Sequence, residues 1–359
     1  MTSGTTGEPQ PNVTDPALTA TVTSTTVTPT TTALEWSVVE APMAAYQGLA
    51  IAFIEATTNR PSVWDLGTGR VAQLTPGPAS QVAPLGTRGV MVKTDDAIHV
   101  YERGSMRELF TLPTDDEKER TGLTTSADGA TLWEVDDKRT RFRELTWQGQ
   151  PTGRTIRPPD QHRYAMERLW IGSGLLLVGP DEIYHADGTV TSSPFTPDQY
   201  VGGGPASAVW LECADGSCDA VVRRFSEPPR ETRIPLKLTE PSSTVRGFTS
   251  PDGDSLVLYE LCYPIGTCYS LVTAARPDPV SIGAQGPSPS TFSWGADGDW
   301  LLESRVVHHV FGPPGELTVP PVPRRLEWNG WNLTSVATGE TVPLIPQTIK
   351  PLDYGFLLP

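Results

Sequence analysis

The sequence predicts an all-β protein built from repeated small antiparallel sheets, and three observations lead to this prediction. Proline and glycine, which both interrupt helices, account for 36 and 33 of the 359 residues. From Leu34 onward, short apolar runs rich in β-branched and aromatic residues alternate with turn sequences. Asp-Gly pairs also recur between these runs, with an average spacing of about 40 residues. Together these features favour a repeat of short strands over helices.

The apolar runs have the length and composition of buried strands. "LAIAFIEA" (Leu49–Ala56), "AIHVYER" (Ala97–Arg103) and "SLVLYELC" (Ser255–Cys262) are typical examples. No amphipathic helix of ten or more residues is predicted. The best helical candidate, Thr114–Gly122, is polar on all sides and is interpreted as a loop.

The Asp-Gly pairs divide the chain into units of similar size. In "TSADGATLW" (Thr125–Trp133), "SPDGDSLVLY" (Ser250–Tyr259) and "WGADGDWLLE" (Trp294–Glu303) an apolar strand follows the pair at once. We expect type I′ turns at these pairs, with positive φ at both central residues. The predicted units begin near Leu34, Ser80, Thr121, Glu167, Gln199, Thr244 and Thr291.

Seven such units predict a β-propeller, most simply of seven blades with four antiparallel strands each. Six or eight blades remain alternatives, and the competing architecture is a pair of two-sheet sandwiches. No linker-like stretch interrupts residues 34–359, which favours a single closed ring. The ring closes either through Leu34–Val39 or through "DYGFLLP" (Asp353–Pro359), and the sequence leaves this choice open.

Residues 1–33 differ from the rest in composition. Nine of the fourteen residues from Thr19 to Thr32 are threonine, so the segment has little to bury and predicts a disordered Thr/Pro-rich tether before a single propeller domain at 34–359. We expect that an export signal or anchor precedes the tether; a disordered tail of a cytosolic protein is the alternative. No run of about 18 apolar residues is present, so no membrane insertion is expected within this chain.

Three stretches resemble known propeller families. "PSVWDLGTGRVAQLT" (Pro61–Thr75) is similar to the third strand, turn and outer strand of a WD-repeat blade. "TSADGATLW" and "SPDGDSLVLY" resemble the Ser-Pro-Asp-Gly motif of TolB-type propellers. Most units lack the Trp-Asp pair, and Asp128 and Gly129 are adjacent, unlike the sialidase Asp-box. The resemblance therefore implies a propeller fold without selecting a function.

The four cysteines form two closely spaced pairs. Cys213 and Cys218 flank an Asp-Gly turn, and Cys262 and Cys268 flank a Pro-Ile-Gly turn in the matching hairpin of the next unit. Residues that flank a tight turn lie close enough for a disulfide, so we expect the bonds Cys213–Cys218 and Cys262–Cys268, side by side on one face of the ring. Free thiols and a four-thiolate zinc site are the alternatives. Disulfides indicate an oxidising, extracytoplasmic compartment, and arginine-rich basic residues suggest a bacterial source.

Charge and motif content narrow the function classes. The net charge of −15 argues against nucleic acid as a partner, because phosphate binding needs a basic surface. No catalytic motif, cofactor motif or metal-ligand set is found. The remaining candidates for ligand binding are His308 and His309, in the long insertion of the last unit, and Trp328 and Trp331, for which core packing is the favoured interpretation.

The sequence thus favours a monomeric, extracytoplasmic, non-enzymatic binding or scaffold module that presents a propeller face to a protein or cell-envelope ligand. Two alternatives stay open. One is a secreted hydrolase or lyase that acts at the funnel of the propeller, and the other is the sensor ectodomain of a larger membrane protein.

Overall fold

A computed structural model describes residues 34–358, which all belong to one compact unit of residues 31–359. Inside this range it leaves out 76, 115–121, 126–128, 137–140, 158–166, 172–173, 179–181, 186–188, 193–198, 205–206, 216, 225–229, 237–244, 263–265, 287–289, 296 and 310–324. The backbone alone is described for the strands within 167–185 and for 261–262, 266, 284–286, 305–309, 325–329 and 353–354. The predicted tether at 1–33 lies outside the described residues.

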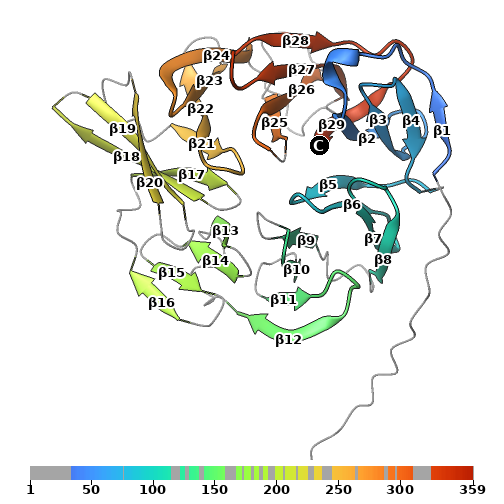
Figure 1. The fold of residues 1–359 in the computed structure, drawn as a ribbon, viewed down its shortest axis with the longest axis horizontal. Coiled ribbons are helices and arrows are strands. Elements are labelled where there is room, and N and C mark those ends of the chain that lie inside the picture. Colours follow the sequence, from blue (N-terminus) through green and yellow to red (C-terminus); the bar gives the residue numbers. More distant parts are fainter. Residues whose placement is uncertain are drawn as a thin grey trace, which may run out of the picture. The chain divides into compact units, whose positions relative to one another are not determined.

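Seven antiparallel units follow one another around a ring, so the predicted seven-bladed propeller is confirmed (Figure 1). From the inside outward, blade 1 contains β29 (Pro351–Leu358), β2 (Ala50–Glu55), β3 (Pro61–Asp65), β4 (Arg70–Gln73) and β1 (Trp36–Val38). Blade 2 contains β5 (Gln81–Leu85), β6 (Gly89–Lys93), β7 (Ala97–Glu102) and β8 (Glu108–Pro113). Blade 3 contains β9 (Gly122–Thr125), β10 (Leu132–Val135), β11 (Phe142–Leu145) and β12 (Pro151–Ile156). Blade 4 contains β13 (Glu167–Ile171), β14 (Gly174–Val178), β15 (Glu182–His185) and β16 (Val190–Ser192).

The other three blades complete the ring. Blade 5 contains β17 (Tyr200–Gly204), β18 (Ser207–Ala214), β19 (Ser217–Arg224) and β20 (Arg230–Leu236). Blade 6 contains β21 (Arg246–Thr249), β22 (Ser255–Cys262), β23 (Gly266–Thr273) and β24 (Arg276–Gly286). Blade 7 contains β25 (Ser290–Trp294), β26 (Trp300–His309), β27 (Arg325–Ser335) and β28 (Thr341–Leu344). One 3-10 turn, η1 (Ala44–Tyr46), precedes β2.

The predicted starts of units two to seven lie within two residues of the first residues of β5, β9, β13, β17, β21 and β25. The first unit differs, because its innermost strand is the C-terminal β29 and not a segment near Leu34. β29 pairs with β2, with Ala50 opposite Leu358 and Phe53 opposite Gly355. β1 instead adds a fifth strand at the outer edge, with Ser37 opposite Val71. Both ends named in the sequence analysis therefore join blade 1, and β29 closes the ring.

Two buried charged side chains hold this closure in place. The carboxylate of Glu40 accepts hydrogen bonds from the backbone N–H groups of Gln347, Thr348 and Ile349 at 2.9, 2.6 and 2.9 Å. Arg103, at the end of β7, donates to the carbonyl oxygens of Gly86 and Leu357 at 2.6 and 3.0 Å. Burial lowers the pKa of Arg103 to about 10, so it remains a cation at neutral pH. These bonds tie the segment after β1 and blade 2 to the C-terminal region.

The hydrophobic core is divided among the interfaces between neighbouring blades. Phe53, Trp64 and Trp331 meet between blades 1 and 7, where Trp64 stacks on Trp331 with ring centroids 6.2 Å apart. Further clusters lie between blades 1 and 2, 2 and 3, 5 and 6, and 6 and 7. Trp64, Trp133 and Trp210 lie in strands and are buried in this core.

Each antiparallel blade turns twice at one side of the ring and once at the other. In blades 2–7 the second and third strands join at one side, which we call the hairpin face. The first and second strands join at the opposite side, which we call the Asp-Gly face because the pairs Asp252-Gly253 and Asp297-Gly298 lie there.

The turns on the Asp-Gly face correct the type I′ prediction. Gly253 and Gly298 have φ of 73° and 78°, whereas Asp252 and Asp297 are not among the residues with positive φ. Each aspartate instead accepts a hydrogen bond from the N–H group two residues later, at 3.1 Å from Asp254 and 3.0 Å from Asp299. The carboxylate thus stabilises the turn as an Asx turn, and only the glycine needs the left-handed conformation.

Blades 5 and 6 are hydrogen-bonded to each other into one eight-stranded sheet. Their inner strands β17 and β21 run parallel, with Gly202 opposite Gly247. A Cβ atom on Gly202 would lie 2.0 Å from the carbonyl oxygen of Gly247, and one on Gly204 would lie 2.0 Å from the hydroxyl of Thr249. The three consecutive glycines of "YVGGGPAS" therefore form a tight inner strand.

Candidate binding surface

The hairpin face is uneven around the ring. In blades 5, 6 and 7 the second and third strands contain 8 and 8, 8 and 8, and 10 and 11 residues. In blades 1 to 4 the same strands contain 4 to 6 residues. Three consecutive blades thus present long hairpins on one arc of this face.

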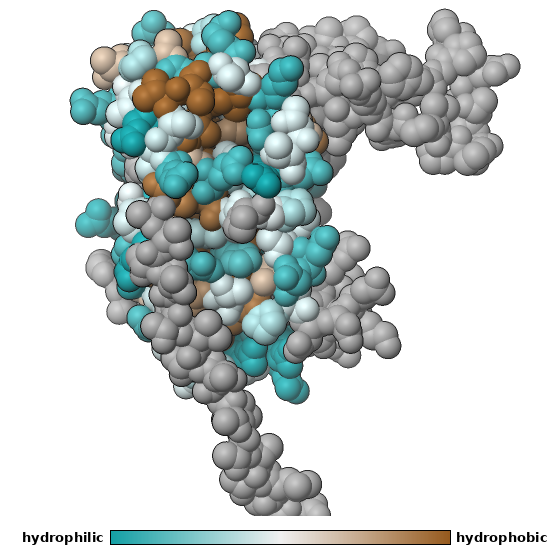
Figure 2. Space-filling view, turned by 90° about the vertical axis from the view of Figure 1, so that its right-hand side faces the viewer, coloured by the Kyte–Doolittle hydropathy of each residue, from teal (hydrophilic) through white to brown (hydrophobic). Residues whose placement is uncertain are grey.

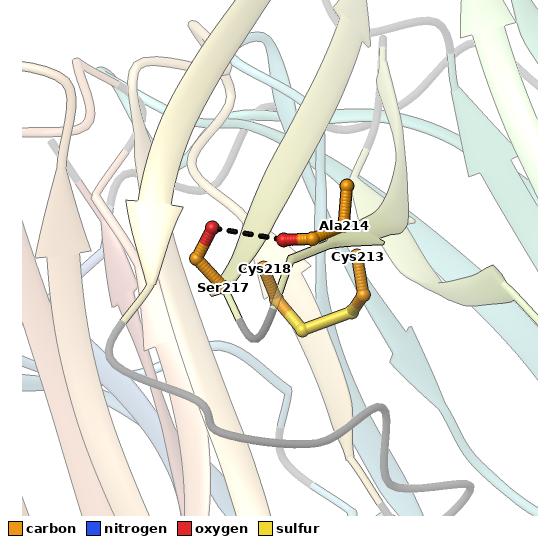
Figure 3. The surroundings of a disulfide bond; sticks show 4 residues. All are labelled: Cys213, Ala214, Ser217 and Cys218. Atoms are coloured by element: carbon orange, nitrogen blue, oxygen red, sulfur yellow. Dashed lines mark hydrogen bonds between the residues drawn. A yellow bond between two sulfur atoms is a disulfide. The ribbon is translucent and has the colours of Figure 1, made fainter.

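A disulfide closes the tip of the hairpin in blade 5. Cys213 and Cys218 are bonded, with Cα atoms 4.0 Å apart, and they occupy opposite positions in the β18–β19 register (Figure 3). The loop contains two residues, because Ala214 pairs with Ser217, and Asp215 has φ of 53°. The hydroxyl of Ser217 donates to the carbonyl oxygen of Ala214 at 3.2 Å. The predicted disulfide is present, and the positive φ at Asp215 is what a type I′ turn requires of its first central residue.

The hairpin of blade 6 also carries a disulfide-bonded cysteine, Cys268. In the β22–β23 register Cys268 lies opposite Glu260, and Cys262 lies opposite Gly266. The side chain of Cys262, its predicted partner, is outside the described set. The alternative interpretation, a zinc site built from all four thiolates, is wrong because Cys213 and Cys218 bond to each other.

A small groove lies between the outer strand β20 of blade 5 and the cysteine-bearing hairpin of blade 6. Its volume is about 130 Å³, and its walls include Leu236, Val245 and Leu258, together with Tyr259, Glu260 and Ser270. Leu236 of β20 pairs with Cys218, and Cys268 itself lines the groove. The groove therefore connects the two cysteine-bearing hairpins, which lie side by side on the same face as the sequence predicted.

The charges around the groove favour a basic partner. Arg233 of β20 contacts Glu212 at 2.6 Å, Glu231 at 3.3 Å and Asp219 at 3.9 Å. The hydrogen bond to Glu212 raises the pKa of this exposed guanidinium. Arg233 is therefore paired with acidic residues of its own blade. Glu260 forms no ion pair within the described part of the chain. One carboxylate thus stays available at the groove wall.

A buried polar cluster supports the neighbouring interface between blades 6 and 7. Glu303 of β26 is 1% exposed and accepts hydrogen bonds from the hydroxyl of Ser290 at 2.6 Å and the amide of Asn332 at 2.7 Å. Tyr269 of β23 accepts a bond from the N–H group of Ser290 at 3.0 Å, and burial raises the pKa of this tyrosine. A buried carboxylate is tolerated when its oxygens are satisfied in this way, so we assign Glu303 a structural role.

The ligand-binding candidates from the sequence fall into two groups. His308 and His309 end β26, where they pair with Leu326 and Arg325, and Trp328 pairs with Val306. These three residues lie on the distal half of the blade 7 hairpin, and their side chains are not described. Trp331 is 1% exposed and packs against Phe53 and Trp64. The favoured interpretation of Trp331, core packing, is therefore correct, and this residue is not a surface platform for a ligand.

Sequence reasoning missed the groove residues Leu236, Tyr259, Glu260 and Ser270. Tyr259 and Glu260 belong to "SLVLYELC", which was interpreted only as a strand. Their positions, three and two residues before Cys262, were the available signal. Within the described ranges, no group of three or more His, Cys, Asp or Glu residues is arranged to hold a metal ion. The same residues include no helix with the length and hydropathy of a membrane span.

No protein-family model and no curated protein sequence matches this chain. Solved structures similar to it include virginiamycin B lyase from Staphylococcus aureus (TM-score 0.45, 13% identity, 75% of this chain and 94% of that one). TolB from Acinetobacter baumannii gives a TM-score of 0.41 at 11% identity, over 86% of this chain and 66% of that one. The WD40 domain of SCAP from fission yeast gives 0.41 at 10% identity, over 88% and 90%. These likenesses concern the fold alone: the chain is a seven-bladed β-propeller that resembles WD-repeat and TolB-type propellers.

Proposed function

We propose that this protein is an extracytoplasmic, non-enzymatic binding module that presents the hairpin face of blades 5–7 to a protein or cell-envelope ligand. The observation that carries the proposal is the concentration of long hairpins in blades 5–7, with a groove beside the two hairpins that carry disulfide-bonded cysteines. A cross-linked hairpin loses less conformational freedom on binding, which favours association.

The compartment and the partner chemistry follow from the same residues. Disulfides persist in oxidising environments, which supports a place outside the cytoplasm. Leu236, Val245 and Leu258 offer an apolar contact, and Glu260 offers a carboxylate beside it. We therefore expect a partner that inserts an apolar side chain next to a basic residue, with residues 1–33 acting as a flexible tether.

Retention of a partner from solubilised cell envelope by the purified full-length protein tests this proposal. Glu260→Lys reverses the charge at the groove, and Glu340→Lys makes the same change at an exposed residue of the Asp-Gly face. We expect Glu260→Lys to weaken retention at least fivefold, corresponding to about 1 kcal/mol, and Glu340→Lys to leave it unchanged. Equal retention by both variants, or no partner retained by the wild type, would overturn the proposal.

A further inference from the structure

A second cavity lies at blade 1, next to the segment that connects this blade to blade 7 where the ring closes. Its volume is about 340 Å³, and strands β1 to β4 form one wall. Thr348 and Ile349, in the segment between β28 and β29, form part of the opposite wall. The Glu40 carboxylate holds this segment through its backbone N–H groups, so the cavity is built into the ring closure.

The strand register explains which side chains face the cavity. Phe53 lies opposite Ser62, and Ser62 lies opposite Gln73, so these three form one row across β2, β3 and β4. Ser37 of β1 lies opposite Val71 of β4 in the adjacent part of the same surface. Because neighbouring positions in a strand alternate between faces, Glu55 shares the face of Phe53, and Glu35 shares that of Ser37.

The base of the cavity is largely apolar and contains one serine hydroxyl. Phe53 and Ile349 are 1% and 7% exposed and supply an apolar floor. Ser62 is 3% exposed, lines the cavity, and its hydroxyl has no hydrogen-bond partner among the described residues. This hydroxyl opens onto the cavity and has no competing partner there within the described part of the chain, so it can donate to or accept from a polar group of a ligand.

The rim of the cavity is acidic. Glu35 and Glu55 line it, and none of the described residues that line it is Lys or Arg. One oxygen of Glu55 accepts a bond from Thr58 at 2.7 Å, which leaves the other available, and the side chain of Gln73 is held by Arg60 at 3.1 Å. Figure 2 faces the side on which β1 lies and shows apolar and polar surface next to each other there. Two carboxylates above an apolar floor suit a cation carried on an apolar stem.

We propose that this cavity binds a guanidinium or ammonium group on a short apolar stem, with Glu35 and Glu55 contacting the cation, Phe53 and Val71 contacting the stem, and Ser62 bonding a polar group at the base. Its volume lies at the lower end of the range for small-molecule sites, which fits a ligand of amino-acid size. Different blades build this cavity and the blade 5–6 groove, so the proposal does not depend on the function proposed above.

Calorimetric titration of the full-length protein with N-acetyl-arginine amide tests the site, and N-acetyl-citrulline amide serves as the neutral isostere. We expect the arginine probe to bind at least about tenfold more tightly than the citrulline probe. Glu35→Gln and Glu55→Gln should each weaken binding about fivefold. Glu340→Gln, which removes the same charge on the Asp-Gly face, should have no effect. Thermal unfolding of each variant shows whether it is folded.

Three results would overturn the proposal: no binding of the arginine probe, equal binding of both probes, or a loss with Glu340→Gln as large as with Glu35→Gln. A Gly-Gly-Arg-Gly-Gly peptide distinguishes the source of the cation. Tighter binding of this peptide indicates the side chain of a protein partner, and equal binding indicates a free small molecule; either result supports the cation site.

Discussion

Blades 1–4 and blades 5–7 share one strand order but differ in how far their second and third strands extend. In blade 3 these strands contain 4 residues each, whereas in blade 7 they contain 10 and 11. Packing between blades needs only the central part of each strand, and Leu132 of blade 3 and Leu302 of blade 7 are both fully buried. The core therefore determines the ring, while hairpin length varies without affecting it. The hairpins of blades 5–7 extend further than packing between blades requires, so we assign the binding role to them.

The stability of blades 1–4 and that of blades 5–7 should respond very differently to an added methyl group on an inner strand. Gly202→Ala in blade 5 places a Cβ atom 2.0 Å from the backbone oxygen of Gly247, while Gly122→Ala in blade 3 meets nothing within 4 Å. We expect Gly202→Ala to lower the free energy of unfolding by about 3 kcal/mol or more, because two inner strands must separate. Gly122→Ala should change it by less than about 1 kcal/mol. Urea denaturation measures both, and equal effects would contradict the close approach of β17 and β21.

Removing a buried carboxylate from blade 7 or from blade 3 gives a second comparison of stability between the two groups of blades. Glu303→Leu in blade 7 leaves the hydroxyl of Ser290 and the amide of Asn332 without their acceptor, and we expect a loss of about 2–3 kcal/mol. Glu144→Leu in blade 3 frees Arg154, whose side chain is 44% exposed and can return to water, so about 1 kcal/mol is expected. The denaturation midpoints of the two variants, each compared with wild type, check this order. A larger loss for Glu144→Leu would show that the blade 6–7 cluster is not the more important one.

Removal of the blade 5 disulfide should have a smaller and local effect. The bond closes a sequence separation of only 5 residues, so Cys213→Ser with Cys218→Ser should lower stability by about 2 kcal/mol at most. Hydrogen exchange should increase at the tip of β18–β19 and remain unchanged in blades 1–4. Faster exchange throughout the ring would mean that the disulfide supports the whole fold.

The smallest expected effect is the pH dependence of an ion pair in blade 2. His99 contacts Glu108 at 2.8 Å, and this hydrogen bond lowers the pKa of the Glu108 carboxyl below its usual 4.5. A carboxyl with a lowered pKa in the folded state stabilises the protein above its unfolded pKa, and this contribution is lost as the pH falls through the lower folded value. Wild type should therefore exceed Glu108→Gln by up to about 1 kcal/mol at pH 6, because the pair is partly exposed. This advantage should decline at pH values below 4.5, and an advantage independent of pH would exclude the ion pair as its source.

Much of the fold could be predicted because the repeated features are local. Gln81, Gly122 and Ser290 begin inner strands close to the predicted positions, since turn residues and apolar runs are encoded side by side. The cysteine pair at 213 and 218 was predictable for the same reason. Ring closure was not, because the pairing of Ala50 with Leu358 joins positions about three hundred residues apart and nothing local specifies it.

The candidate sites were harder to predict than the fold. Leu236 and Glu260 line one groove although they belong to different blades, and Glu35 and Thr348 line one cavity from opposite ends of the chain. The Asp252 turn shows a different limit, because an Asp-Gly pair fits both a type I′ turn and an Asx turn, and the four-residue connection between Ser250 and Ser255 selects the second. Trp331 was correctly expected in the core, whereas its partner Trp64 could be identified only from the structure.

The most direct test of the binding role is a hydrogen-exchange footprint of the full-length protein with the partner that it retains from the cell envelope. We predict protection of the β18–β19 and β22–β23 hairpins, including the segments around Cys213 and Glu260, with no change at the Asp-Gly turns around Asp252 and Asp297. Protection of those turns, or of the short hairpins of blades 2–4, would contradict the assignment of the binding surface to blades 5–7.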